Sequence, residues 1–168
     1  MDNTTLTVIK LLFILGFTLQ NLEEALWLPK WSQLAKKFHN PVTTNEFIFA
    51  VLIITTIGYL LTAIDLFFGQ TGNLANLIFL GFVGMMGINS FFLHLIATIV
   101  TKKYSPGLIT GLLLNLTFSI IIFNEYIRRE INPVYLVLSV ILVSAVILLS
   151  LKPLFRIGSQ IINYSQNI

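Results

Sequence analysis

The chain contains no cysteine, which excludes disulfide bonds, thiolate metal ligands and a thiol nucleophile. It is also poor in charge, because Asp, Glu, Lys and Arg together make up only 10% of its 168 residues. So few ionic groups are atypical of a protein whose surface faces water. Any metal site would have to be built from the few His, Asp and Glu side chains.

Apolar residues take the place of the missing charges. They make up 56% of the chain, and the mean hydropathy is +0.88. These values are typical of an integral membrane protein, and the chain is too short for several domains beside a membrane part. We therefore expect an all-α fold, a polytopic helical bundle that forms a single membrane domain over residues 1–168, either alone or as a homo-oligomer.

Five segments are long and apolar enough, at about 20 residues each, to cross a hydrocarbon core of about 30 Å as helices. The first is unusual, because only twelve uncharged residues separate Lys10 from Glu23. It can span a membrane only if Lys10 snorkels and the carboxylates face protein or water. The predicted spans are residues 6–28, 47–68, 74–101, 106–126 and 133–151.

The charges in the loops predict an orientation. Five spans place the first loop, the third loop and the C-terminal tail on one side, and most of the basic residues lie there. The positive-inside rule then puts the N-terminus outside and the C-terminus in the cytoplasm. These cations suit anionic lipid head groups, and no nucleic-acid partner is expected. They are Lys30, Lys36, Lys37, Lys102, Lys103, Lys152 and Arg156.

The ends of the spans carry further signals. Apolar residues in the first loop recur on one helical face, which predicts an amphipathic helix lying on the inner leaflet. Thr43 and Glu46 have the spacing of a capping box at the start of the second span. Residues 152–168 repeat the amphipathic pattern more weakly and are predicted to be an interfacial tail. The apolar residues of the first loop are Trp31, Leu34, Ala35 and Phe38.

Polar residues inside the first span are the clearest pointer to function. Gln20, Glu23, Glu24 and Trp27 have the spacing i, i+3, i+4 and i+7, so they share one face of an α-helix. Two adjacent carboxylates away from water would take up a proton, pair with a cation or bind a metal. The alternative is that the helix ends near Leu22 and both glutamates are solvated.

His94 in the third span is the predicted partner, because it lies at about the same depth as Glu23. Ser90 and Thr98 share its helical face. Asn89 would be turned away by roughly 140° in an α-helix and would need a broad cleft to join them. The alternative is that His94 only hydrogen-bonds a neighbouring helix.

Other polar residues have simpler predicted roles. Ser105 is expected to cap the fourth helix, and Pro106 is expected to lie in its first turn. Asn115 either makes a structural hydrogen bond or contacts a substrate. Asp65 is expected to be an interfacial carboxylate.

The run Gln20-Asn21-Leu22-Glu23-Glu24, followed by Trp27-Leu28-Pro29, resembles the defining element of the HXXEE-motif membrane proteins, a bacterial family of largely unknown function. Asn89, His94 and the segment 103–110 resemble the second conserved block of that family. The resemblance implies a location in a bacterial cell membrane. One departure matters, because Gln20 stands where the family has histidine, and glutamine is neither titratable near neutral pH nor a typical strong metal ligand.

We therefore expect an intramembrane polar site that faces the cytoplasmic leaflet and acts on a lipid-like molecule. Glu23, Glu24 and His94 would be its acid/base residues or the ligands of Zn, Mn or Fe. Two alternatives remain: a non-enzymatic accessory, immunity or lipid-binding protein with a membrane partner, and a small proton-coupled transporter. The expected substrate contacts are Gln20, Trp27, Asn89, Tyr104 and Asn115.

Overall fold

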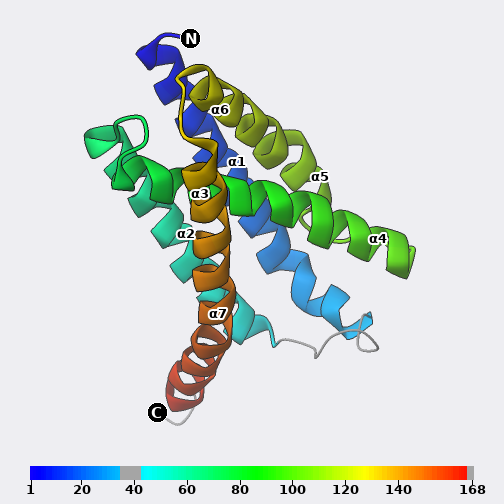
Figure 1. Cartoon of the computed structure of the whole chain (residues 1–168). Coiled ribbons are helices and arrows are strands. Elements are labelled where there is room, and N and C mark those ends of the chain that lie inside the picture. Colours follow the sequence, from blue (N-terminus) through cyan, green and yellow to red (C-terminus); the bar gives the residue numbers. More distant parts are fainter. Residues whose placement is uncertain (35–42, 166–168) are drawn as a thin grey trace.

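The computed structural model describes residues 1–34 and 43–165, and this part of the chain is helical with no strand. The expected all-helical fold is thus confirmed (Figure 1). The elements are α1 (Asn3–Leu34), α2 (Thr44–Phe68), α3 (Leu74–Ile88), η1 (Asn89–Leu95), α4 (Ile96–Thr101), α5 (Leu108–Thr110), η2 (Gly111–Leu116), α6 (Thr117–Arg128) and α7 (Pro133–Ser165).

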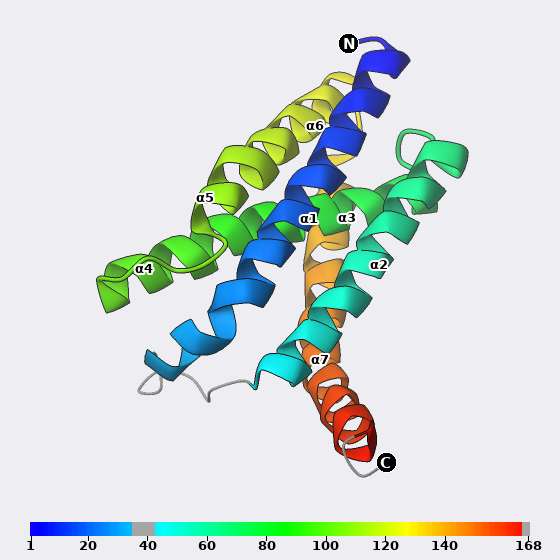
Figure 2. The same ribbon diagram turned by 180° about the vertical axis from the view of Figure 1, so that it is seen from behind.

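Within the described residues, five continuous helices are long and apolar enough to cross a membrane, as the sequence predicts. Two of them contain a π-helical segment, so α3, η1 and α4 form one helix and α5, η2 and α6 form another. The helix α1 lies between α2 and the α5–η2–α6 helix, which the reverse view shows (Figure 2). The candidate spans are Asn3–Gln33, Thr44–Phe68, Leu74–Thr101, Leu108–Arg128 and Pro133–Ile161.

The first and last helices run further than the predicted spans. In α1 the helix continues through Pro29 to Leu34, although proline lacks the N–H that would donate to the preceding turn. The Pro29 carbonyl accepts a hydrogen bond from Ser32 Oγ at 2.8 Å. The residues from 30 to 34 are therefore part of α1, and Ala35 and Phe38 of the expected interfacial helix lie outside the described residues. In α7 the helix likewise passes Pro153.

An aromatic cluster forms the core between α1 and α3. Phe13 and Phe17 are fully buried, and they meet Phe79 and Phe82 edge to face with ring centroids 5.1 to 6.2 Å apart. Such edge-to-face pairs add to the stabilisation that burial of the rings provides. The two helices that carry Gln20 and His94 are thereby fixed relative to each other.

A buried ion pair corrects two predictions about charge. Lys10 does not extend to the surface, and the Asp65 carboxylate is not solvated, because Lys10 Nζ lies 2.5 Å from Asp65 Oδ2 and both residues are buried. Asn76 Nδ2 donates to the other Asp65 oxygen at 2.8 Å. Each charge satisfies the other, so neither side chain needs to reach an interface.

Glycines let α3 approach its neighbours closely. A Cβ on Gly81 would lie 2.5 Å from the backbone oxygen of Ser139 in α7, whereas a Cβ on Gly87 would lie 3.4 Å from Ser119 in α6. Of these two glycines, Gly81 is therefore the one whose position a side chain would disturb.

The two positions make a matched pair for mutagenesis. Gly81→Ala should lower the free energy of unfolding by about 1–3 kcal/mol, because the backbone of α7 must move to admit the methyl group. Gly87→Ala should be neutral or stabilising by up to about 1 kcal/mol, since alanine favours the helix. Thermal unfolding in detergent measures both variants, and equal effects would contradict the packing explanation.

Candidate functional site

Two π-helical segments lie side by side at the level of Gln20. The first, η1, carries Ser90 and His94, and the second, η2, carries Asn115. A π-helical turn holds one more residue than an α-helical turn and is frequent at functional sites. Here the two segments place polar side chains from two helices around one residue of α1.

Gln20 is that residue, and it is completely buried. Its Oε1 accepts hydrogen bonds from Ser90 Oγ at 3.1 Å and from Asn115 Nδ2. Its Nε2 donates to Glu24 Oε1 at 2.8 Å. The glutamine that replaces the motif histidine therefore joins α1 to both π-helical segments and orients the Glu24 carboxylate.

Glu24 pairs with His94, with Oε1 lying 2.9 Å from His94 Nε2. A carboxylate only accepts hydrogen bonds, so Nε2 of the ring carries a proton. On the other side of the ring, Nδ1 lies 3.3 Å from Ser105 Oγ. Both members of the pair are largely shielded, with side-chain exposures of 12% for Glu24 and 7% for His94. The structure thus places a carboxylate, an imidazole and a hydroxyl in series.

Glu23 points elsewhere, because adjacent residues of an α-helix differ in direction by about 100°. Its carboxylate accepts hydrogen bonds from Tyr104 Oη and from Thr110 Oγ1, the latter at 2.6 Å. Burial, and then the hydrogen bond to Glu23, raise the pKa of Tyr104 above its usual value, so the phenol stays a donor at neutral pH. Trp27 lies on this second side of α1, where it lines a separate hollow with Glu23 and Tyr104.

Of the two glutamates, Glu24 therefore contacts His94 and Glu23 contacts Tyr104. Among residues 1–34 and 43–165, no group of three or more His, Asp or Glu is close enough to hold a metal ion. The expected ligand set of Glu23, Glu24 and His94 is divided, with Glu24 at the imidazole and Glu23 at Tyr104.

Asn89 does reach His94, although an α-helix would have turned it away. Its Nδ2 lies 3.4 Å from His94 Nε2. The reason is the π-helical geometry of η1, in which residues five apart follow one another along the helix. Nothing in the residue spacing indicates that extra residue in the turn.

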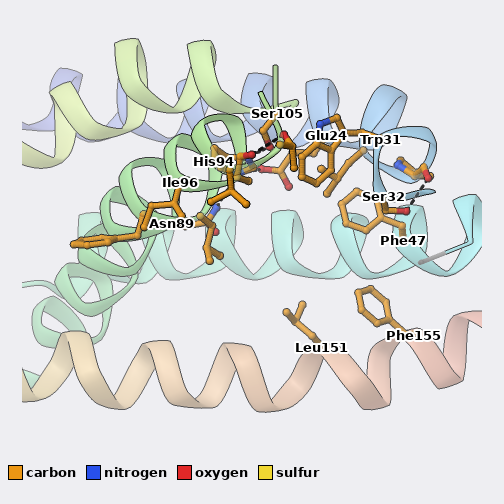
Figure 3. Close-up of a pocket in the computed structure, with 17 residues that line it drawn as sticks. Glu24, Trp31, Ser32, Phe47, Asn89, His94, Ile96, Ser105, Leu151 and Phe155 are labelled. Carbon is orange, nitrogen blue, oxygen red and sulfur yellow. Dashed lines mark hydrogen bonds and ion pairs between the residues drawn. The ribbon is translucent and has the colours of Figure 1, made fainter. Parts of the chain in front are cut away.

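A cavity of about 600 Å³ opens beside the Glu24–His94 pair. Its polar end is formed by Glu24, Asn89, His94 and Ser105, and apolar side chains from α1, α2, η1, α4 and α7 form most of the rest (Figure 3). Trp31 also lines it, and its buried Nε1 has no hydrogen-bond partner within the described residues. The apolar lining includes Leu28, Phe47, Phe92, Leu93, Ile96, Ala97, Val100, Leu151 and Phe155.

Ser105 is the site residue that sequence reasoning missed. The expected helix cap does not form, because Gly107, with φ of +91°, precedes the first residue of α5 and no side chain caps that helix. The Ser105 hydroxyl is consequently directed to His94. A signal was present in the Ser-Pro-Gly run, since glycine after proline favours a turn and delays the start of a helix.

Comparisons with known proteins agree with the motif. A family model described as a protein of unknown function with HXXEE motif matches residues 11–122. The chain is 45% identical over 150 residues to a Bacillus subtilis (strain 168) protein called "Uncharacterized protein YrkK", covering 89% of this chain and 94% of that protein. No solved structure matches the chain.

Proposed function

This chain belongs to the HXXEE-motif family, and on that basis we propose that it is a multi-pass membrane protein that binds an amphipathic, lipid-like molecule and acts on it with the Glu24–His94 pair. The cavity beside this pair is the observation that carries the proposal. Its apolar walls suit hydrocarbon, and its single polar end suits a head group with hydrogen-bonding atoms.

The polar end has unused hydrogen-bonding capacity. Within the described residues, Glu24 binds its partners through Oε1, and no hydrogen bond occupies Oε2. Asn89 brings a donor to this polar end. Outside the polar end, the indole N–H of the lining residue Trp31 is a buried donor with no partner within the described residues. A bound molecule with both donor and acceptor atoms would satisfy these groups. A buried polar group without a hydrogen-bond partner otherwise costs free energy.

The exposed apolar surface supports entry from the bilayer. Among the described residues, α4 makes no extensive contact with any element except η1, and it diverges from the bundle in Figure 1. The cavity-lining residues Leu93, Ile96 and Val100 are each at least half exposed. In a membrane these side chains would meet lipid tails, so a chain could enter between α4 and α7.

The proposed orientation keeps the N-terminus outside and the site toward the cytoplasmic leaflet. At the N-terminal end, the terminal amine and Arg129 are both paired with Glu125. Asp2 and Glu130 offset the remaining positive charge of this end, which includes Arg128. The opposite end carries exposed Lys102, Lys103 and Lys152, which suit anionic head groups.

The Glu24–His94 pair supports proton transfer as its chemistry. A carboxylate that holds one nitrogen of an imidazole stabilises the protonated ring and leaves the other nitrogen available as a base. A Zn, Mn or Fe ion at this place would receive only one carboxylate and one imidazole from the pair, so water or the bound molecule would have to complete its coordination.

A change that fills the cavity tests the proposal. Ala97→Trp places a large side chain in the cavity, whereas Ile99→Trp changes the same helix at a residue that is 65% exposed and outside the cavity lining. We expect protein purified in mild detergent to retain a lipid-like molecule, and Ala97→Trp to reduce its amount at least about tenfold. Mass spectrometry of the extracted molecules measures this.

The control variant and the melting temperature make the result decisive. Ile99→Trp should retain the same amount as the unchanged protein, and both variants should melt within a few degrees of it. Equal retention by the two variants, or no retained molecule in the unchanged protein, would remove the support for a lipid-binding cavity.

A second candidate is a non-enzymatic accessory protein in which the polar cluster only ties helices together. The hydrogen bonds of Gln20 to Ser90, Asn115 and Glu24 favour it, because they join three helices by themselves. Co-purification of a stoichiometric membrane protein, with no lipid-like molecule, would support this function instead.

A further inference from the structure

We propose that Ser105 is a nucleophile activated by His94 and Glu24, so that the substrate class is an acyl ester of an amphipathic alcohol. This inference rests on the proposed function and specifies which bond of the bound molecule would be cleaved. It is carried by the series of contacts from Ser105 Oγ to His94 Nδ1 at 3.3 Å and from His94 Nε2 to Glu24 Oε1 at 2.9 Å.

The Ser105 hydroxyl has no structural task in the turn that holds it. Its backbone N–H donates to Thr98 Oγ1 at 3.0 Å, and its carbonyl accepts from Leu108 N at 3.1 Å. The helix α5 begins without a side-chain cap. The backbone of Ser105 is therefore held by other groups, and within the described residues its hydroxyl bonds only His94.

The proton positions favour activation of the hydroxyl. The shortest contact of His94 Nε2 is with the acceptor Glu24 Oε1 at 2.9 Å, which favours a proton on Nε2. The amide donors of Gln20 and Asn89 lie farther from that atom, at 3.2 and 3.4 Å, and Gln20 Nε2 donates to Glu24 Oε1. In the neutral ring, Nδ1 is then an acceptor, and the hydroxyl hydrogen of Ser105 is the donor that faces it. The order of roles is that of serine–histidine–carboxylate systems, with the two ring nitrogens exchanged, because here the serine faces Nδ1 and the carboxylate faces Nε2.

The turn also fixes the three groups at close range. A Cβ on Gly107 would lie 2.8 Å from Glu24 Oε1 and 2.8 Å from His94 Cε1, so the backbone of the turn packs directly on the pair. The φ of +91° at Gly107 is a conformation that glycine adopts without strain. Ser105 is only 1% exposed, so its hydroxyl is shielded from bulk water, and the residue lines the cavity in which the substrate would bind.

The reaction balances with water as the second reactant. Ser105 Oγ attacks the acyl carbonyl carbon, and its proton passes to His94 Nδ1. The ester C–O bond then breaks, the leaving alkoxide takes the proton from Nδ1, and an acyl-Ser105 remains. Water attacks that acyl group, its proton passes through Nδ1 to Ser105 Oγ, and the carboxylic acid leaves. Glu24 stabilises the imidazolium that forms in each half.

Covalent labelling tests this inference. The probe is a fluorophosphonate with a long alkyl chain, which phosphonylates an activated serine, added to the full-length protein in mild detergent. Peptide mass spectrometry should find the label on Ser105, and Ser105→Ala should abolish it. His94→Asn should slow labelling by about 10²-fold or more, and Ser150→Ala, a matched change in α7, should leave it unchanged.

The outcomes separate the two proposals. An unlabelled Ser105, a label on a different serine, or equal labelling rates for His94→Asn and the unchanged protein would each overturn the role of Ser105. Lipid retention by the unchanged protein would still support the proposed function in those cases. If Ser105→Ala does not fold, the labelled peptide of the unchanged protein and the rate for His94→Asn decide.

Discussion

Replacing Asp65 by Ala should lower the free energy of unfolding by about 3–5 kcal/mol, because it leaves the Lys10 ammonium buried without its partner. Lys10 Nζ lies 2.5 Å from Asp65 Oδ2, and the two residues are 6% and 1% exposed. The ring faces of Phe79 and Tyr126 lie 5.4 Å from Nζ, and they compensate only part of the lost charge. Denaturant or thermal unfolding in detergent measures the effect.

The double variant Lys10→Met with Asp65→Leu is the appropriate control. It removes both charges and keeps similar volumes, so it should cost less than Asp65→Ala alone. Glu46→Gln, at an exposed capping hydrogen bond of α2, should change the free energy by about 0.5 kcal/mol or less. A loss below about 1 kcal/mol for Asp65→Ala would mean that water reaches Lys10.

Replacing Glu24 by Gln should slow labelling of Ser105 by about 10²-fold, because a neutral amide cannot stabilise the imidazolium of His94. Replacing Glu23 by Gln should change the same rate by less than about threefold, since Glu23 binds Tyr104 and Thr110. The two changes are chemically identical and adjacent, so each is the control for the other. The labelling rate at fixed probe concentration is the measurement.

Melting temperatures distinguish a loss of chemistry from a loss of fold. Both variants should melt close to the unchanged protein, because an amide oxygen accepts hydrogen bonds as a carboxylate oxygen does. The glutamine of Glu24→Gln would still accept from His94, and that of Glu23→Gln would still accept from its hydroxyl donors. Equal slowing by Glu23→Gln and Glu24→Gln would contradict the separation of the two carboxylates. Unfolding of Glu24→Gln alone would assign Glu24 to structure.

The capping box of α2 is a feature that residue spacing within a few positions predicts correctly. Thr43 and Glu46 exchange the two predicted hydrogen bonds, because three-residue spacing alone determines that geometry. The first residue of α5 could not be predicted from residue spacing in this way. Ser105 and Pro106 both suit a helix start, and the positive φ of Gly107 decided that α5 begins at Leu108.

Helix packing determines which neighbouring residue each polar side chain of α1 contacts. Periodicity placed Gln20, Glu23, Glu24 and Trp27 on one face, but that face is wide enough to meet different neighbours on its two edges. Gln20 and Glu24 turn toward His94, and Glu23 turns toward Tyr104. A single apolar helix carries no information about which neighbour lies at which edge.

By itself, the sequence determined the five apolar helices, because the number of consecutive apolar residues needed to cross a bilayer is a property of the segment alone. It also identified Gln20, Glu24 and His94 as polar groups that need partners away from water. Only the tertiary structure decided that Lys10 pairs with Asp65 and that Ser105 faces His94. Lys10 and Asp65 are 55 residues apart, and His94 and Ser105 are separated by the end of one helix and a turn. The geometry of both pairs depends on helix packing and on the backbone between the helices, which no local spacing specifies.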